Sequence, residues 1–337
     1  MINLNTSLDF SHFPVMLDEV IKICSPKKGG VFIDCTFGGG GYSKKLLRFS
    51  KTQVIALDRD KYILKIAKEL EKKYPNRFSF FQKRFSEVDT VIKDQSVDVI
   101  IFDLGLSSIQ LNNLTRGFSF KSKAKLDMSM GLNNLSAEEV VNNYSEQKLK
   151  LIIKVLGEEK DASNIARNII KTRSLKKITN VNQLVEIIEK SKKRDFKKSI
   201  NPSTKTFQAL RIFVNKEITE LINGIINATK VLKPGGKILI VSFHSIEDKI
   251  VKYFFSNFSS NKAKPSRYIP ENNDKDISLF HEYRNRILKP SAKEININFP
   301  SRSAKLRYAI RNENKFVHPD KLISKFKKYL DLESFYA

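Results

Sequence analysis

The chain has 337 residues, 41% of them hydrophobic, which excludes a disordered protein and leaves room for one large domain with a smaller one. Its formal net charge is +25 and is uneven: residues 1–110 hold 17 Lys+Arg against 13 Asp+Glu, whereas the rest of the chain holds 44 against 23. Such an excess favours a polyanion partner, most often nucleic acid, over the alternative of solvated helix faces in a lysine-rich protein.

The chain begins with MINLNTSLDF, which has neither the basic region nor the apolar core of a signal peptide. No apolar run approaches the length of a membrane span. The cysteines, Cys24 and Cys35, match no zinc-binding spacing, and the four histidines lie far apart, so no metal site is expected. We therefore expect a cytoplasmic protein in a reducing compartment, without membrane contact and with both cysteines as small buried residues.

Short apolar runs rich in β-branched and aromatic residues recur in the first third of the chain and again near its end. They predict strands over 31–34, 53–58, 78–81, 97–103, 237–243 and 303–310. Between the second and third of these, residues 62–72 carry apolar side chains on one helical face. Strands that alternate with helices indicate βαβ units and a parallel sheet covered on both faces, which is an α/β fold.

The gap between Asp103 and Lys237 is too long for one crossover, so part of it must be an inserted unit. We expect an all-helical domain over residues 112–204, which divides the main domain into 1–111 and 205–337, the latter ending in a basic tail helix. The helical signals are a capping box at Ser136–Glu139, an apolar face of Leu149, Ile152, Ile153 and Leu156 that Gly157 can end, an N-cap at Thr179 for a helix through Ile187, and a long helix over 206–232 that returns to the sheet.

Four consecutive glycines, Gly38 to Gly41, lie between the first predicted strand and a helix that starts near Tyr42. Cofactors bind at this place in open α/β sheets, at the carboxyl ends of the strands. The dinucleotide fingerprint G-x-G-x-x-G needs a glycine where Ser43 stands, and no Gly-Lys-Ser/Thr follows as a P-loop would require. Neither a pyrophosphate nor a triphosphate is therefore well indicated.

Carboxylates close three of the predicted strands: Asp34 the first, Asp58 the second and Asp103 the fourth. Asp58 follows Gly38 by 20 residues and can accept hydrogen bonds from a ribose. Three carboxylates suit S-adenosylmethionine, which carries an ammonium and a sulfonium, better than a diphosphate. The pattern favours a class I methyltransferase, with flavin or NAD binding as the remaining alternative.

Residues 103–130 read DLGLSSIQLNNLTRGFSFKSKAKLDMSM, which resembles the bacterial 16S rRNA cytosine-N4 methyltransferases, the RsmH or MraW family. Members of that family carry DLGVSSxQLD, RGFSF and LDMRM in this order. Further colinear matches are HFPVML (12–17), GEE (157–159), IAR (165–167), TFQALRI (206–212), VN (214–215), SFHSIED (242–248) and RSAKLR (302–307). The resemblance spans roughly residues 12–311.

The resemblance implies a class I, Rossmann-like sheet and transfer of a methyl group from S-adenosylmethionine to a cytidine N4 in the decoding centre of 16S rRNA, within the small ribosomal subunit. It also implies the cofactor contacts. These are Gly40, Gly41 and Tyr42 at the methionine part, Asp58 at the ribose, Phe85 against the adenine, and Asp103 and Gln110. The sequence departs from the family pattern in four places: Tyr42 and Asn201 each stand for His, Ser129 for Arg, and Phe299-Pro300 for Pro-Arg.

The exocyclic N4 of cytosine is a poor nucleophile because its lone pair is delocalised into the ring. An acceptor beside the amino group favours tetrahedral geometry and frees the lone pair, provided that the nitrogen is held in line with the methyl group. Asp103 is the candidate catalytic residue, and positioning of the cofactor is an equally weighted alternative role.

Several other residues are candidates for the RNA, each with a structural alternative. Ser107 and Ser108 contact the base or cap the next turn, and His244 contacts RNA, takes up a proton or makes a structural hydrogen bond. Phe118 and Phe120 pack against the extruded base or belong to the core. Phosphate contacts are expected from Arg116, Arg211, Arg302 and Arg307, whereas the basic run over 192–198 is expected to be a solvated face.

Two other classes of protein compete with the rRNA methyltransferase. A DNA amino-methyltransferase usually has a Pro-Pro-aromatic turn after the fourth strand, where this chain has Leu104-Gly-Leu-Ser-Ser108. A non-catalytic RNA-binding module would not need to keep Asp34, Asp58 and Asp103 with the glycine loop. Binding of S-adenosylmethionine separates that module from both kinds of methyltransferase.

Overall fold

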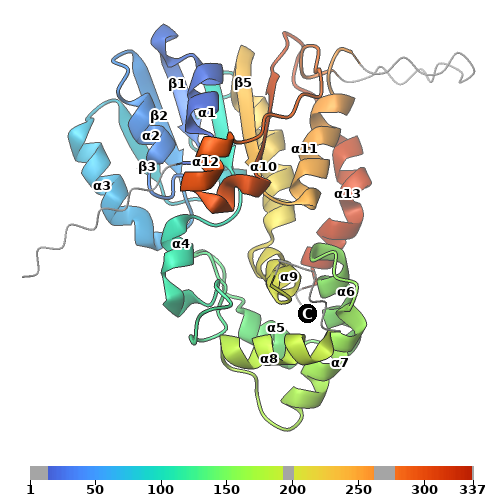
Figure 1. Ribbon diagram of the computed structural model, residues 1–337. Helices are drawn as coiled ribbons and strands as arrows, with labels where there is room; N and C mark the ends of the chain where they lie inside the picture. Colours follow the sequence, from blue (N-terminus) through green and yellow to red (C-terminus); the bar gives the residue numbers. More distant parts are fainter. Residues whose placement is uncertain (1–13, 193–200, 262–277, 336–337) are drawn as a thin grey trace, which may run out of the picture.

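A computed structural model describes residues 14–192, 201–261 and 278–335. Its centre is one sheet with the strand order β3-β2-β1-β4-β5-β6, in which β1 to β5 are parallel and β6 is antiparallel to β5 (Figure 1). The strands are β1 (Gly30–Asp34), β2 (Thr52–Leu57), β3 (Phe78–Phe81), β4 (Val97–Asp103), β5 (Leu232–Ser242) and β6 (Lys305–Ile310). The order reverses between β1 and β4, which is the place where α/β sheets of this kind bind ligands.

The predicted strands are confirmed, two of them with identical bounds and the others within a few residues. The exception is β5, which begins at Leu232 rather than Lys237 because it pairs with Val97 before its register shifts opposite Val97 and Val99. Gly235, with φ of +77°, lies in this irregular stretch. Pro234-Gly235-Gly236 therefore forms an irregularity within β5, and the helix that precedes this strand ends at Val231.

Helices cover both faces of the sheet, as expected. One face is packed by α1 (Leu17–Cys24), α2 (Gly41–Leu46) and α3 (Leu64–Lys73). The other is packed by α10 (Glu217–Val231), α11 (Ser245–Asn257) and α13 (Asp320–Glu333). In β4, Val99 and Ile101 belong to the first core, whereas Ile100 and Phe102 belong to the second. This alternation follows from the two-residue period of a strand whose faces are both buried.

The segment after β4 is helical, as predicted, and lies below the sheet in Figure 1. Its helices are α4 (Ser108–Asn112), α5 (Ala137–Asn143), α6 (Glu146–Leu156), α7 (Ala162–Arg173), α8 (Val181–Ser191) and α9 (Thr204–Asn215). The four apolar residues predicted to share one face of α6 are all buried. The division at residues 112 and 204 stays a prediction, since α6 packs against both α7 and α9 and the apolar core is continuous.

Two helix predictions are corrected. The long helix over 206–232 is two helices, α9 and α10, because Lys216 between them has a left-handed φ of +50°. The N-cap of α8 is Asn180 rather than Thr179: the Asn180 side chain accepts from the Gln183 backbone N–H at 3.1 Å, which completes a capping box. The capping box at Ser136–Glu139 is confirmed.

Gly157 ends α6 as predicted, but for a different reason. Its own backbone stays right-handed, and the left-handed residue is Glu158. A Cβ atom on Gly157 would lie 2.5 Å from the Lys205 carbonyl oxygen, so this glycine permits the close approach of α9.

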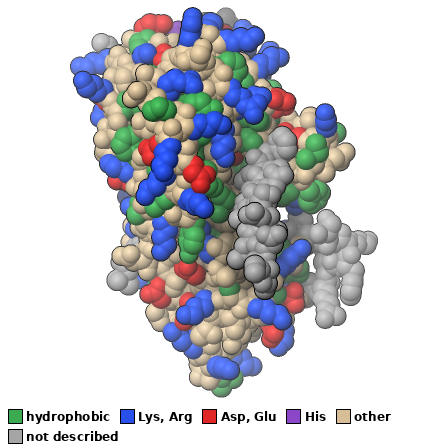
Figure 2. All heavy atoms as spheres, turned by 90° about the vertical axis from the view of Figure 1, so that its left-hand side faces the viewer, with side chains coloured by type: hydrophobic (Ala, Val, Ile, Leu, Met, Phe, Trp, Pro, Cys, Tyr) green, Lys and Arg blue, Asp and Glu red, His purple; other side chains and the backbone are tan. Residues whose placement is uncertain are grey.

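The chain beyond β5 closes the remaining side. A short α12 (Ala292–Ile297) and a 3₁₀ turn over Phe299–Ser303 lie near the carboxyl edge of the sheet, in front of the strands in Figure 1. Lysine and arginine side chains are spread over the face that Figure 2 shows, with carboxylates between them. Within the described residues no helix is long and apolar enough to cross a membrane. Cys24 and Cys35 are buried and unpaired, as predicted.

Candidate active site

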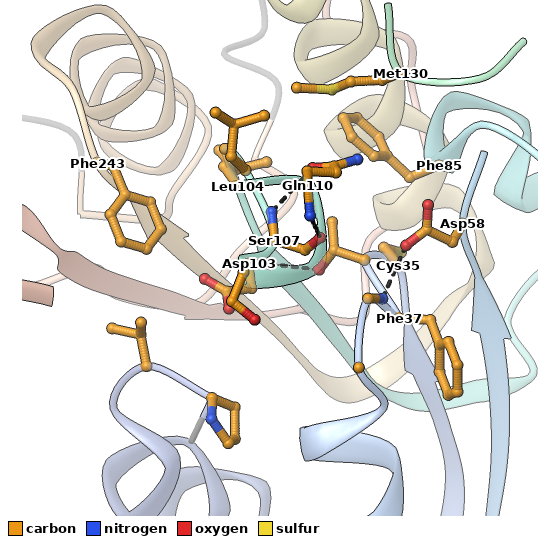
Figure 3. A pocket seen from close by; sticks show the side chains of 18 of the residues that line it. Cys35, Phe37, Asp58, Phe85, Asp103, Leu104, Ser107, Gln110, Met130 and Phe243 are labelled. Carbon is orange, nitrogen blue, oxygen red and sulfur yellow. Dashed lines mark hydrogen bonds between the residues drawn. The ribbon is translucent and has the colours of Figure 1, made fainter. Parts of the chain in front are cut away.

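A pocket opens at the carboxyl ends of β1, β2 and β4, and the glycine loop forms part of its wall (Figure 3). The backbone N–H of Gly38 donates to Asp58 Oδ2 at 2.8 Å. Gly40 has φ of +74°, and a Cβ there would lie 2.9 Å from the Phe37 ring. A Cβ on Gly41 would lie 2.7 Å from Pro14. Absent side chains thus let the loop turn tightly, and Gly38, Gly39 and Gly41 line the pocket whereas Gly40 does not.

Asp58 lies at one side of the pocket, next to Phe85 in Figure 3. Its Oδ2 accepts from Gly38 N at 2.8 Å and its Oδ1 from Asp60 N at 2.9 Å. These bonds lower the pKa of the Asp58 carboxyl, but burial raises it more, so the net shift is upward. Each carboxylate oxygen keeps a second lone pair, so Asp58 is fixed in direction and still able to accept hydrogen bonds from a ligand.

Asp103 lies at the other side of the pocket, beside Phe243. Its backbone N–H donates to the Thr36 hydroxyl at 2.7 Å, which ties the end of β4 to β1. Its Oδ1 is buried and has no hydrogen-bond partner among the described residues, whereas the Tyr42 hydroxyl interacts with the carboxyl group. Burial raises the pKa of the Asp103 carboxyl well above its usual value, and the carboxylates of Asp34 and Glu247 add to the rise. An orphaned buried carboxylate is costly, and a cationic ligand would compensate it.

Asp34, the third predicted carboxylate, lies beneath the loop rather than in the pocket wall. It is fully buried, and its Oδ2 accepts from the Ser43 hydroxyl at 2.7 Å. Burial raises its pKa to about 6, against the lowering effect of the Ser43 hydrogen bond. Asp34 therefore joins β1 to α2 and sets the shape of the glycine loop.

Tyr42 lines the pocket, and its hydroxyl lies between the Val15 carbonyl and the Asp103 carboxyl. The side chain is 3% exposed, and the hydroxyl donates to the Val15 carbonyl. Burial raises the pKa of the Tyr42 hydroxyl well above its usual value, as does the neighbouring Asp103 carboxylate. The tyrosine thus joins the chain at Val15 to α2, with its hydroxyl beside the Asp103 carboxyl.

Phe85 provides an aromatic wall that is held by a residue absent from the sequence-based predictions. Its ring meets that of Phe102 edge to face, with centroids 5.5 Å apart. A Cβ on Gly224, in the middle of α10, would lie 2.6 Å from the Phe85 ring. Sequence reasoning missed Gly224, although a glycine inside a helix pattern signals a close contact.

We expect Gly224→Ala to weaken binding of S-adenosylmethionine by about 10-fold, because the added methyl group displaces the Phe85 ring. Titration calorimetry measures the change. Gly235→Ala, where a Cβ would meet no atom within 4 Å, is a second glycine variant that leaves the pocket untouched but strains a positive φ. Equal cofactor affinities for wild type and Gly224→Ala would contradict the assigned role of Phe85.

Hydrogen bonds to Asp60 hold the loop after β4 in place. Ser107 caps α4 and forms a capping box with Gln110, whose Nε2 donates to Asp60 Oδ2 at 2.8 Å. Arg116 donates to the same Asp60 oxygen at 2.5 Å and is 6% exposed. Gln110 does line the pocket, and Ser107 and Ser108 line it too. Arg116 does not, and this corrects the expectation of a phosphate contact, since its guanidinium is buried in an ion pair.

Asn215 fastens the LDMSM loop (126–130) to the end of α9. It is fully buried, accepts from Met130 N at 2.8 Å and donates to the Met128 carbonyl at 2.8 Å. Met130 lines the pocket, so Asn215 sets one of its walls from behind. Ser129, which stands where the resembled pattern has Arg, offers its carbonyl to Arg116 at 2.9 Å.

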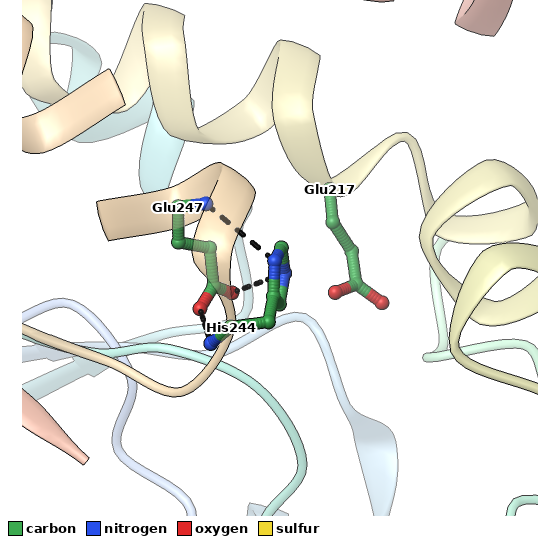
Figure 4. Close-up of side chains that lie close together, drawn as sticks. All are labelled: Glu217, His244 and Glu247. Atoms are coloured by element: carbon green, nitrogen blue, oxygen red, sulfur yellow. Dashed lines mark hydrogen bonds and ion pairs between the residues drawn. The ribbon is translucent and has the colours of Figure 1, made fainter. Parts of the chain in front are cut away.

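His244, Glu247 and Glu217 meet on the wall beside Phe243, with potential metal-ligand atoms within 4.8 Å of one another (Figure 4). Both oxygens of Glu217 already accept from Arg211 at 2.8 Å. His244 caps α11: its Nδ1 accepts from the Glu247 N–H at 3.5 Å, and its Nε2 lies 3.1 Å from Glu247 Oε1 but makes no hydrogen bond among the described residues. The contacts of Glu217 with Arg211 and the capping of α11 favour a structural network.

Of the three other arginines predicted to contact phosphate, two form ion pairs within the protein and one is exposed. Arg211 pairs with Glu217, and Arg307 is 2% exposed and donates to Asp248 at 2.7 Å. Both are engaged inside the protein, which corrects their assignment to phosphate. Arg302 is exposed. Phe118 is buried in the core, which was one of the two roles predicted for it, and the Phe120 ring packs edge to face against the Phe207 ring. The basic run over 192–198 and residues 12–13 lie largely outside the described residues.

Comparisons with known proteins found a family model, curated relatives and solved structures that are similar to this chain. The model of the MraW methylase family matches residues 9–312. A relative from Rickettsia massiliae, named ribosomal RNA small subunit methyltransferase H, is 42% identical over 301 residues, which cover 89% of this chain and 97% of that protein. One of the same name from Ehrlichia ruminantium is 40% identical over 306 residues, covering 89% and 99%. The crystal structure of an rRNA methylase from Streptococcus thermophilus aligns with a TM-score of 0.38 at 10% identity, covering 87% and 96%.

Proposed function

This chain belongs to the MraW methylase family, and from that membership we infer that it is a methyltransferase of small-subunit rRNA. We propose that it uses S-adenosylmethionine and methylates the exocyclic N4 of a cytidine in 16S rRNA. The observation that supports the chemistry is the buried Asp103 carboxyl beside the glycine loop, whose Oδ1 has no partner among the described residues. In its ionised form this carboxyl places a negative charge in the pocket wall, where a methyl donor with a positive charge would bind.

The residues present fit S-adenosylmethionine. Asp58 offers acceptors for ribose hydroxyls, Phe85 offers a flat apolar surface for adenine, and Asp103 offers a negative charge for the ammonium or sulfonium. When bound, the cofactor supplies an electrophilic methyl group. Gly38 contributes by holding Asp58 in direction, and Thr36 contributes by holding the backbone of Asp103.

Asp103 carries the chemical role in this proposal. In its ionised form the carboxylate accepts a hydrogen bond from the cytosine amino group, which favours a localised lone pair on N4. The same carboxylate then lies ready to take the proton that N4 loses. Phe243, Leu104 and Pro300 line this side of the pocket and exclude water around the base.

The pH dependence of cofactor binding tests the state of Asp103. Its raised pKa means that the carboxyl carries a proton at lower pH, and a cationic ligand prefers the ionised form. We therefore expect affinity for S-adenosylmethionine to rise with pH, with proton release on binding. Calorimetry in two buffers of different ionisation enthalpy measures that release. We expect Asp103→Asn to abolish this proton release. An unchanged release in the variant would show that another group is its source.

The substrate class is tested by transfer of a labelled methyl group to small ribosomal subunits from a strain that lacks this activity. We expect label in the small-subunit RNA and none in large subunits treated in the same way. Label in DNA, in protein or in large-subunit RNA would favour the competing methyltransferases. Absence of both transfer and cofactor binding would favour a non-catalytic RNA-binding module. The buried, unpaired thiols of Cys24 and Cys35 fit the proposed cytoplasmic location.

A further inference from the structure

An exposed aromatic ring, that of Phe299, belongs to a segment that borders the pocket. Phe299 is 62% exposed and its neighbour in the chain before Asn298, Ile297, is 68% exposed. The residues on either side of Phe299, Asn298 and Pro300, both line the pocket. The backbone of Phe299 therefore lies beside the cavity that would receive a target base, while its side chain is exposed outside the pocket lining.

The segment that carries Phe299 is held firmly to the body of the protein. Ser291 caps α12, and Glu294 in that helix accepts from the Met16 backbone N–H at 2.7 Å. Ser301 is fully buried, and its backbone N–H donates to the Asn298 carbonyl at 2.9 Å. The ring is thus carried by a turn that is already ordered, so little conformational entropy of the protein is lost when a ligand stacks on it.

A guanidinium accompanies the ring. The Cζ atom of Arg302 lies 4.1 Å from the Phe299 ring centroid, and its Nη1 donates to the Phe299 carbonyl at 3.3 Å. In the part of the chain that the structure describes, no ion pair joins Arg302 to a carboxylate, in contrast to Arg116, Arg211 and Arg307. Arg302 keeps its charge available at the rim.

We propose that Phe299 and Arg302 form a stacking platform for the nucleotide next to the target cytidine. This inference rests on the function proposed above. The target base leaves its stack to enter the pocket, and the adjoining nucleotides remain at the mouth of the pocket. An aromatic ring binds a base of any identity through its face, and a neighbouring arginine adds attraction for the base or its phosphate. The platform replaces the stacking that the flanking base loses.

The test is the methylation of small ribosomal subunits by the full chain, with KM for subunits and for S-adenosylmethionine measured separately. We expect Phe299→Ala to raise KM for subunits by about 5- to 100-fold, with kcat and the cofactor KM unchanged. Phe299→Tyr is expected to restore the wild-type value and Phe299→Leu is not, because stacking needs a ring. Arg302→Ala is expected to reduce the salt dependence of KM by about one unit of logarithmic slope.

Phe335→Ala is the matched control, since Phe335 is 40% exposed, has Lys148 Nζ 5.5 Å from its ring centroid and does not line the pocket. Its KM for subunits is expected to match wild type. An unchanged KM for Phe299→Ala would overturn the platform, and so would a rise shared equally by Phe335→Ala. Restoration by Phe299→Leu would indicate an apolar protein contact instead. If wild type itself transfers no methyl group, the proposed function fails rather than the platform.

Discussion

Replacement of Asp103 by alanine is expected to lower kcat/KM for methyl transfer on the order of 10³-fold. The variant loses the acceptor for the cytosine amino group and the charge that faces the cationic cofactor. Oδ1 of Asp103 has no partner among the described residues and the carboxyl is buried, so its removal relieves a desolvation cost, while the Tyr42 hydroxyl loses a neighbouring acceptor but keeps the Val15 carbonyl. The folded state is therefore expected to be at least as stable as wild type, which thermal unfolding checks.

Asp94→Asn, on the exposed turn before β4, is the control for loss of one carboxylate and is expected to keep full activity. Asp103→Asn separates the two roles of Asp103. If it binds S-adenosylmethionine nearly as wild type but transfers the methyl group slowly, the carboxylate acts in the chemical step. If transfer at saturating cofactor is normal, Asp103 positions the cofactor only, and the catalytic assignment fails.

Replacement of Asp58 by alanine is expected to weaken cofactor binding by about 10²- to 10⁴-fold. Two charge-assisted hydrogen bonds to a ribose are lost, each contributing about 1.5–3 kcal/mol. The backbone N–H groups of Gly38 and Asp60 also lose their acceptors, so the glycine loop is expected to lose its fixed shape. Calorimetry measures the affinity, and the stabilisation of thermal unfolding by cofactor gives a second reading.

Glu69→Ala, an exposed carboxylate on the neighbouring α3, is the control and is expected to bind cofactor as wild type. The cofactor concentration needed for half-maximal methylation is expected to rise in Asp58→Ala in proportion to the loss of affinity. Wild-type affinity in Asp58→Ala would show that the ribose does not bind at Asp58, and the orientation proposed for the ligand would be wrong.

The sheet was predictable because its signals are local. Buried parallel strands such as β4 are short, continuous apolar runs, and each of β1, β2 and β4 has its polar residue where the strand ends. The position of Asp58 and Asp103 at one edge then follows from parallel topology alone. Phe85 and Gln110 entered only through the resemblance to a family, since no local pattern distinguishes them from other aromatic and amide side chains.

The rest depended on contacts between distant segments. Nothing near Arg116 in the sequence indicates that Asp60 will neutralise it, and the same holds for Arg307 and Asp248. A break at Lys216 is equally hidden, because an αL lysine inside an amphipathic pattern leaves the apolar period almost unchanged. Charge counts therefore overstate the number of arginines available to RNA.

The most direct test of the central claim is the identity of the methylated nucleoside. Small subunits that lack the modification are treated with wild-type protein and labelled S-adenosylmethionine, the RNA is digested, and nucleosides are separated and identified by mass spectrometry. We predict N4-methylcytidine, formed at a rate that Asp103→Ala lowers on the order of 10³-fold. A methyl group on a ring carbon, a ribose or another base would contradict the account of Asp103 as the acceptor beside the cytosine amino group.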